Sequence, residues 1–541
     1  MKIKRSAILF LFAAMSSLTF AQERQWVFFT DKADLSGYQA SDLLSESALR
    51  NRARQGISLD SRDFPVNETY LEQVSETGAL LRHKSRWFNA VSVTATSESL
   101  EAIRQLPFVK DIRPVATFRS PNPVITSECD TAPYLGTAFQ QLGMIGIDDL
   151  HQQGFKGEGV TVAVFDNGFY RVDSLPGMAH LFEEGRIAKQ WDFVSNEENV
   201  FDKCIHCMHG TYVFSILAAV QPGGLYGGAP EATYLLFRTE NDSSETHQEE
   251  DNWIAAAELA DSLGAQIFTT SLGYSTFDEG EGDYSLEDLD GNTALITRAA
   301  DIAASRGILV VNSAGNEGNR GIVAPADGDS VLAIGAVDEC GVIGGFSSRG
   351  PSGDGRIKPD IVAMGVGNSF YYPDGRIRVG SGTSFSCPMV TGLAACLMQK
   401  HPELSAWDVH RTLIQSGDRY ETPDMVYGHG LPSASRFEAI LGDSPLPNGE
   451  YADFRSGDLI VYPNPATHVI HVAWIAPVSP IGYDIVLIDA SGRRIKLLAH
   501  SFSDKEWQLS LPTDINSGLY ILELTQPEAP DARFVRKVVV R

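Results

Sequence analysis

Between about residues 135 and 442, short apolar runs alternate with stretches in which apolar residues recur at helical spacing. Continuous apolar runs predict strands buried on both faces, and the recurring spacing predicts amphipathic helices, for example over 252–264 and 294–307. Strands that alternate with helices in this way predict an α/β domain with a doubly wound, mostly parallel sheet. The runs that we expect to be strands are 160–166, 232–238, 265–273, 307–315, 331–338 and 360–365.

The residues on either side of this region have different patterns. Residues 22–120 mix strand and helix signals and predict a small α+β unit, in which one helix opens with Ser97 as its cap. Residues 457–541 alternate apolar and polar positions between turn residues, which predicts an all-β, sandwich-like domain. Pro-rich polar stretches at 119–128 and 443–456 predict linkers. In the first unit we expect strands at 26–30, 88–96 and 108–115 and helices at 46–56 and 97–106.

The first 21 residues are predicted to be a signal peptide. Lys and Arg residues near the start precede an apolar run at 7–18, and small Thr19 and Ala21 offer a cleavage site after position 21. A membrane anchor is the alternative, but the run is short for a bilayer span. We therefore expect the chain to be exported.

Composition narrows the classes of partner. The chain has 43 Lys and Arg against 69 Asp and Glu, a net charge of −26, which disfavours nucleic acids and anionic membranes as partners. Its 541 residues predict several domains, and its 6 cysteines are too few for a disulfide scaffold. Cys387 and Cys396 lie among small apolar residues and are expected to be buried thiols. The cysteines in loop-like contexts, which could pair, are Cys129, Cys204, Cys207 and Cys340.

A carboxylate, an imidazole and a hydroxyl stand at the ends of predicted strands or the starts of predicted helices, and together these groups could catalyse a reaction. Asp166 follows an apolar strand, His209 precedes a helix, and Ser384 starts another helix in which Pro388 is expected in an early turn. A serine hydroxyl is a poor nucleophile that needs an imidazole to take its proton and a carboxylate to orient that imidazole. Asn316, in a Gly-flanked loop after another strand, is placed to donate a hydrogen bond to an oxyanion.

The stretches around these residues resemble the subtilases, the subtilisin-like serine proteases. The chain order Asp, His, Ser is that of the family, and "VAVFDNGF", "HGTYV", "GTSFSCP" and "SAGNEG" match its motifs. The chain departs from the commoner pattern at Asn167, Phe385 and Ser386. The resemblance covers about residues 135–442. It implies a serine endopeptidase that forms an acyl-enzyme, with Asp166, His209 and Ser384 as catalytic triad and Asn316 in the oxyanion hole.

The same resemblance implies how protein or peptide substrates bind. A peptide would lie as an extended strand along Ser271, Leu272 and Gly273, and Ala314 with Gly315 would wall the primary specificity pocket. Tyr274 would either narrow a subsite or pack internally. Residues 22–120 are similar to a subtilase propeptide, which implies a zymogen whose propeptide inhibits it and is removed by self-cleavage within about 116–134.

The C-terminal segment resembles the type A sorting domain of the type IX secretion system. "VYPNP", "LIDASGRRI", "SGLYILEL" and "VRKVVVR" match its elements. This implies export through the Sec pathway and then across the outer membrane, with the secretion machinery as a partner and a secreted or surface-attached product. The alternative is an ordinary accessory β-sandwich. Basic residues cluster here in an otherwise acidic chain: Arg533, Arg536, Lys537 and Arg541.

Two clusters leave alternatives open. In "CIHCMHG", Cys204 and Cys207 suit a disulfide with each other or with a partner such as Cys129, free thiols, or a zinc site, with His206 as an exposed loop residue. The acidic loop at 278–292 is either solvated or a calcium site that uses Asp288, Asp290 and Asn292. Catalysis is expected to need no cofactor; the resemblance leaves Ca²⁺ as a candidate structural ion without assigned ligands.

Two other functions compete with a serine peptidase. One is a catalytically inactive surface adhesin on a protease scaffold, against which the complete set Asp166, His209, Ser384 and Asn316 argues. The other is a metallopeptidase that uses the Cys/His cluster, which a chelator would inactivate.

Overall fold

The computed structural model describes residues 22–115 and 138–443, apart from short gaps at 33–34, 36, 203, 242–247 and 276–282, and parts of 459–540. The chain divides into two compact units, 1–444 and 445–541. The predicted signal peptide, the propeptide cleavage region, the linker at 119–128 and residues 444–456 of the second linker lie outside the described residues.

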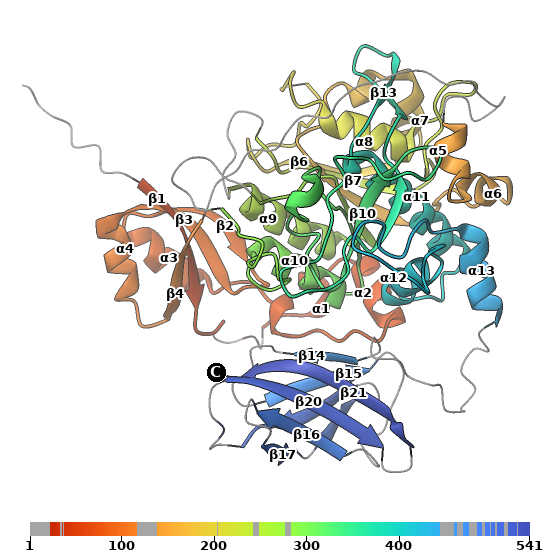
Figure 1. The fold of residues 1–541 in the computed structure, drawn as a ribbon. Coiled ribbons are helices and arrows are strands. Elements are labelled where there is room, and N and C mark those ends of the chain that lie inside the picture. Colours follow the sequence, from red (N-terminus) through yellow and green to blue (C-terminus); the bar gives the residue numbers. More distant parts are fainter. Residues whose placement is uncertain are drawn as a thin grey trace, which may run out of the picture. The chain divides into compact units, whose positions relative to one another are not determined.

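A seven-stranded parallel sheet forms the centre of the first unit (Figure 1). The expected strands are all present, so the predicted α/β class is confirmed. The strand that the sequence pattern missed is β6, at one edge, because its side chains are mostly half exposed and give no continuous apolar run. The order is β11 (Ile361–Met364), β10 (Val331–Val337), β9 (Leu309–Ser313), β8 (Ile267–Thr270), β5 (Thr161–Asp166), β7 (Thr233–Arg238) and β6 (Ile187–Asp192).

Helices cover both faces of this sheet (Figure 1). Val162 and Val164 of β5 join a core that includes α8 (His209–Ala218) and α11 (Thr383–Lys400). The alternate residues Ala163 and Phe165 join a second core with α9 (Gln248–Leu263) and α10 (Leu295–Ser305). Successive side chains of a central strand enter the two cores in turn. Both faces of the strand are therefore buried, and its sequence is apolar throughout.

The strand order predicts a ligand site at the carboxyl ends of the central strands. From β5 the chain builds β6 and β7 on one side and then β8 to β11 on the other. Ligands bind outside the carboxyl ends of parallel strands where the order reverses in this way. Asp166 ends β5, and Ser271 follows directly after its neighbour β8.

Shorter elements complete this part of the first unit, and of these the sequence predicted only a short helix ending near residue 441, which is the last helix named below. They are α5 (Phe139–Gly143), α6 (Ile147–Gln152), α7 (Ala179–Glu183), the hairpin of β12 (Asn368–Tyr371) and β13 (Ile377–Gly380), α12 (Ala406–Gln415) and α13 (Ala434–Asp443).

Residues 22–115 form the α+β layer that the sequence predicted. The four strands are antiparallel in the order β2 (Leu80–Ser85), β3 (Ala90–Thr96), β1 (Gln22–Phe29) and β4 (Val109–Pro114). The cap expected at Ser97 is wrong: Thr96 is the N-cap of α4 and accepts the amide hydrogen of Ser99. The helices are α1 (Ala40–Leu43), α2 (Glu46–Arg54), α3 (Glu68–Glu76) and α4 (Ser97–Arg104).

This layer packs on α9 through buried charges. Glu258 of α9 accepts hydrogen bonds from the Ser85 hydroxyl at 2.5 Å and the Arg86 amide at 2.9 Å. Arg52 of α2, with only 3% of its side chain exposed, binds Asp261 of α9 at 2.8 Å. Asp251, also on α9, is 1% exposed, and burial raises its pKa to about 7. The contact therefore depends on carboxylates removed from water, whose charges are costly unless paired.

The second unit is all-β, as predicted. Two four-stranded antiparallel sheets enclose a core that includes Val472, Leu487, Trp507 and Leu522. The side chains of the basic cluster at the end of the chain lie outside the described residues. The strands are β14 (Leu459–Tyr462), β15 (Val469–Trp474), β16 (Asp484–Asp489), β17 (Arg494–Lys496), β18 (Ala499–Ser503), β19 (Glu506–Ser510), β20 (Gly518–Gln526) and β21 (Ala529–Val540).

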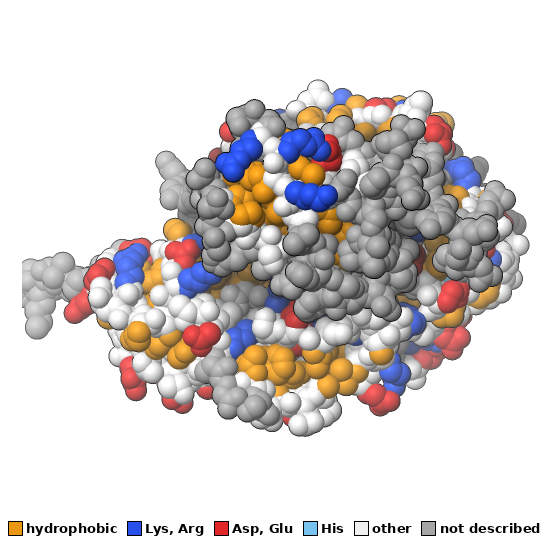
Figure 2. Space-filling model, turned by 90° about the horizontal axis from the view of Figure 1, so that it is seen from below, with side chains coloured by type: hydrophobic (Ala, Val, Ile, Leu, Met, Phe, Trp, Pro, Cys, Tyr) orange, Lys and Arg blue, Asp and Glu red, His pale blue; other side chains and the backbone are white. Residues whose placement is uncertain are grey.

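Charge on the face shown in Figure 2 is mixed. The face in Figure 2 carries Lys and Arg side chains interspersed with Asp and Glu and with small apolar patches, so the net charge of −26 is not gathered there into one acidic surface. None of the helices in the described part of the chain has the length and apolarity that a membrane span requires.

Candidate active site

Asp166 and His209 form a hydrogen-bonded pair. Asp166 ends β5 and is fully buried, and its Oδ1 lies 2.8 Å from His209 Nδ1. His209 is the first residue of α8, and its side chain is 20% exposed. A carboxylate on Nδ1 fixes the tautomer in which Nε2 is the nitrogen that can accept a proton. This pair can therefore act as an oriented general base.

Ser384 is the second residue of α11 and is paired with Ser271. The Ser384 hydroxyl donates to the Ser271 carbonyl at 3.1 Å, and the Ser271 hydroxyl donates to the Ser384 carbonyl at 2.9 Å. Among the described contacts, the Ser384 hydroxyl is therefore bonded to Ser271 and not to His209. A hydroxyl is free to turn about its Cα–Cβ bond, and catalytic hydrogen bonds often form only with substrate in place.

Pro388 explains why the Ser384 carbonyl is available. Pro388 lies in an early turn, as expected, but not in the first: the helix begins at Thr383, which puts Pro388 in its second turn. A residue there would normally donate its amide hydrogen to the carbonyl four positions earlier, which belongs to Ser384. Proline has no such hydrogen, and the hydroxyl of Ser271 takes its place.

Asn316 lies beside the start of α11. Its Oδ1 accepts hydrogen bonds from the amide and the hydroxyl of Thr383, both at 3.0 Å. A Cβ added to Gly382 would lie 3.8 Å from Asn316 Nδ2. Thr383 therefore holds the carbonyl end of this amide, and its NH₂ end lies near Gly382. The sequence motifs identified Asn316 but not Thr383, which orients it.

The segments expected to bind substrate lie side by side. Val323 packs between them: a Cβ added to Gly273 would lie 2.1 Å from Val323 Cγ2, and one added to Gly315 would lie 2.9 Å from it. Gly315 also has φ +107°, where residues with a side chain are strained. The Leu272 carbonyl accepts from Asn312 Nδ2 at 3.0 Å, a contact that no motif indicated.

Two further residues of these segments are buried. Ala314 is fully buried after β9. Tyr274 is 2% exposed and donates its hydroxyl to Glu240 at 2.6 Å, so the packing alternative for this side chain holds.

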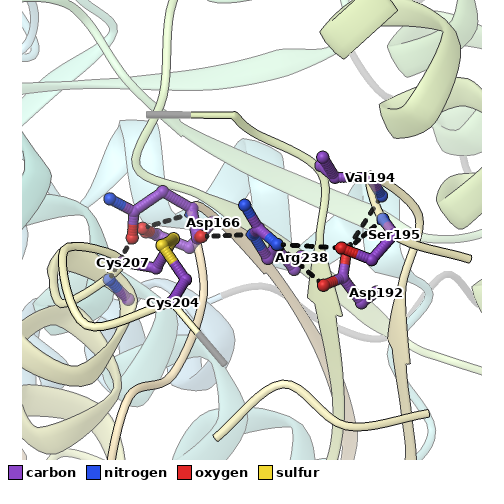
Figure 3. The surroundings of a disulfide bond; sticks show 9 residues. Asp166, Asp192, Val194, Ser195, Cys204, Cys207 and Arg238 are labelled. Atoms are coloured by element: carbon purple, nitrogen blue, oxygen red, sulfur yellow. Dashed lines mark hydrogen bonds and ion pairs between the residues drawn. A yellow bond between two sulfur atoms is a disulfide. The ribbon is translucent and has the colours of Figure 1, made fainter. Parts of the chain in front are cut away.

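A disulfide joins Cys204 and Cys207 just before His209 (Figure 3). The metal interpretation of this cluster is wrong, because both sulfurs are bonded to each other. His206 is exposed, as expected. Cys387 and Cys396 are buried thiols, as predicted, and burial raises the pKa of Cys387 to about 11. The pairing considered for Cys340 is wrong, since it is a free, exposed thiol; Cys129 lies outside the described residues.

We predict that replacing both Cys204 and Cys207 by Ser lowers thermal stability but preserves some peptidase activity. The Cys207 carbonyl accepts the amide hydrogen of Tyr170 at 3.3 Å, so the disulfide loop restrains the turn that follows Asp166. Thermal unfolding and peptide cleavage check this, with Cys340→Ser as control. An inactive double variant together with stoichiometric zinc in the parent would contradict it.

No group of three or more His, Cys, Asp or Glu side chains is arranged to hold a metal ion within the described part of the chain. In the acidic loop, two residues of the calcium alternative cap turns. Asp290 Oδ1 accepts the amide hydrogens of Asn292 and Thr293, both at 2.8 Å. Asp288 Oδ2 accepts from the amide and hydroxyl of Ser285. A structural Ca²⁺ ion stays a prediction without ligands.

Family models match three parts of the chain. The model described as the Subtilase family matches residues 157–430. The model of the Peptidase S8 propeptide domain, Bacteroidota, matches residues 24–127, and that of the Secretion system C-terminal sorting domain matches residues 460–541.

Curated proteins resemble the chain over most of its length. Subtilisin E of Bacillus subtilis (strain 168) is 29% identical over 364 residues, which cover 66% of this chain and 83% of that protein. Serine protease AprX of the same strain is 28% identical over 423 residues, covering 72% and 89%. Subtilisin of Bacillus pumilus is 32% identical over 288 residues, covering 52% and 92%.

Proposed function

The chain belongs to the subtilase family, and from that premise we propose that it hydrolyses peptide bonds with Ser384 as nucleophile, His209 as general base and Asp166 as the orienting carboxylate. The coarser function is established by the family: the protein is a serine endopeptidase made with a propeptide, and its sorting domain indicates export across the outer membrane to the medium or the cell surface. The observation that carries the proposal is the 2.8 Å contact between Asp166 Oδ1 and His209 Nδ1.

The proposed reaction follows from that contact. His209 Nε2 takes the proton of the Ser384 hydroxyl as the oxygen attacks the scissile carbonyl, and the imidazolium then gives this proton to the leaving amine. The acyl group remains on Ser384 until a water molecule, activated by the same imidazole, hydrolyses the ester. Asp166 stays ionised and stabilises the imidazolium.

The oxyanion of each tetrahedral intermediate needs hydrogen-bond donors. Candidates are the amide group of Asn316 and the backbone amide of Ser384, which belongs to the first turn of α11, where amides have no partner four residues earlier in the helix. The positive end of the helix dipole adds to this stabilisation. Because Thr383 holds the other end of the Asn316 amide, this donor is oriented before substrate arrives.

We predict that Asn316→Ala lowers kcat by roughly 10²–10³-fold with little change in KM, a range known for the corresponding amide in this family. The amide would act only on the developing oxyanion, so substrate affinity should not depend on it. Steady-state kinetics with a chromogenic peptide measure both constants, and Asn319→Ala, at an exposed position of the same loop, is the control. An unchanged kcat would remove Asn316 from the proposed site.

Substrates are proposed to bind as an added strand. Ser271, Leu272 and Gly273 continue the line of β8 and offer backbone groups to an extended peptide, and Ala314 and Gly315 lie along the facing segment. The partly exposed state of Leu272 and Gly273 supports this use. The second unit is proposed to engage the outer-membrane secretion machinery.

The propeptide is proposed to inhibit the enzyme by remaining docked on α9. We predict that Asp251→Asn raises the thermal midpoint of the intact zymogen by about 3 °C at pH 8 and leaves it unchanged near pH 4. Burial raises the Asp251 pKa to about 7, above its ordinary value of 3.8, so the contact favours the protonated acid. The stabilisation of the zymogen by protonated Asp251 is complete below about pH 4 and is lost as the pH rises through 7. Asparagine cannot ionise, so the Asp251→Asn zymogen keeps this stabilisation at pH 8.

Differential scanning calorimetry at both pH values, in a Ser384→Ala background that prevents self-cleavage, measures this effect. Glu72→Gln, at an exposed carboxylate of α3, is the matched control. Parallel pH dependence in the Asp251→Asn and parent chains would show that Asp251 is not buried by the propeptide.

A further inference from the structure

Three neighbouring strands of the sheet end in charged side chains. Asp166 of β5 pairs in register with Arg238 of β7, and Asp192 of β6 pairs with the same arginine. Arg238 NH1 binds Asp192 Oδ2 at 2.8 Å, with the two side chains 9% and 1% exposed (Figure 3). Asp192 Oδ1 accepts the amide hydrogens of Val194 and Ser195, both at 2.9 Å. A rigid ion pair therefore lies next to the candidate triad.

Arg238 also holds the residue that follows Asp166. Its Nε donates to the Asn167 carbonyl at 2.9 Å. Asn167 in turn contacts Asp166 and the residue that follows His209: its backbone amide donates to Asp166 Oδ1 at 2.8 Å, and its side-chain Oδ1 accepts the amide hydrogen of Gly210 at 3.3 Å. Movement of Asn167 would therefore shift the carboxylate and the start of α8 together.

The disulfide lies on the other side of the same turn (Figure 3). A Cβ added to Gly168, which has φ +136°, would lie 2.7 Å from Cys207 Cβ and 3.4 Å from Arg238 Cδ. The turn thus passes between the disulfide and the arginine stem with no room for a side chain.

We propose that Arg238 is a positioning residue for peptide hydrolysis, which holds the Asn167 peptide so that Asp166 stays aligned with His209. The inference rests on the proposed function. Two features of the arginine guanidinium suit this role. Its Nη1 binds the Asp192 carboxylate, and its Nε donates to the Asn167 carbonyl. Lysine would keep the charge for Asp192 but has no donor in its stem.

The test is Arg238→Lys in the full chain, expressed and allowed to mature. Active sites are counted with a fluorophosphonate probe, and kcat and KM are measured per labelled site. Because sub-ångström misalignment of a catalytic group is costly, kcat should fall about tenfold or more with KM nearly unchanged. The control is Glu198→Gln, which removes the exposed ion pair of Lys189 on the neighbouring strand and should leave kcat unchanged.

A second variant protects the test against misfolding. Asp192→Asn combined with Arg238→Met removes both charges, so no buried charge is left unpaired, and the same loss of kcat per labelled site is expected. A kcat within about twofold of the parent in either variant would overturn the inference while leaving the proposed function intact. An active parent that is not labelled on Ser384 would instead show that the proposed function has failed.

Discussion

Ser384→Ala is expected to abolish peptide cleavage and to leave the exported protein as an uncleaved zymogen with an intact fold. Loss of a triad serine in this family lowers kcat by about 10⁶-fold, because nothing else forms the acyl-enzyme. The fold should persist, since the Ser271 hydroxyl still has the backbone carbonyl of residue 384 as its acceptor. Casein digestion, intact mass and circular dichroism measure activity, processing and fold.

A neighbouring serine provides the matched control for this variant. Ser386 is also buried at the start of α11, but its hydroxyl donates to the Thr383 carbonyl within the helix at 2.9 Å. Ser386→Ala should therefore mature and cleave casein. Normal casein digestion by Ser384→Ala would refute the assignment of the nucleophile, and an uncleaved Ser386→Ala chain would mean that packing at the helix start controls maturation.

Deletion of residues 457–541 is expected to block passage across the outer membrane while preserving peptidase activity. The chain divides at 444/445, and the second unit has its own core around Leu487, Trp507 and Leu522. All proposed site residues lie in the first unit. The truncated enzyme should therefore fold, cleave peptides and accumulate in the periplasm of its host.

A fusion protein and cell fractionation test whether residues 457–541 are sufficient for export. Residues 457–541 fused to a periplasmic reporter should carry it to the surface or medium, and the full-length Ser384→Ala chain is the control that export does not depend on catalysis. Truncated protein recovered outside the cell in normal amounts would contradict a sorting role and favour an accessory β-sandwich.

The sheet was predictable because its strands are buried on both faces. Runs such as Val160–Asp166 contain no exposed stripe, so their apolar continuity identified them without further information. β6 failed this criterion because it is an edge strand with half-exposed side chains, and β12 and β13 failed it because polar residues interrupt their short sequences, NSFY and IRVG. Ser97 looked like a helix cap because it precedes a glutamate, yet Thr96 takes that position.

The sequence could propose the residues of the candidate site but could not predict their contacts. Each candidate catalytic group stands at the end of a strand or the start of a helix, inside a local motif that sequence alone can display. The contacts of Ser271 with Ser384 and of Arg238 with Asn167 join segments far apart in the chain. They depend on which strands become neighbours, and a local pattern does not contain that information.

Labelling of the matured enzyme with a fluorophosphonate, followed by peptide mass spectrometry, tests the central claim most directly. One label per molecule should be found on Ser384, and labelling should be lost in His209→Ala, because the hydroxyl reacts only when the imidazole takes its proton. Asp166→Asn should label slowly, since the imidazole would be held in the wrong tautomer. An active enzyme that remains unlabelled, or that carries its label on another residue, would contradict the account.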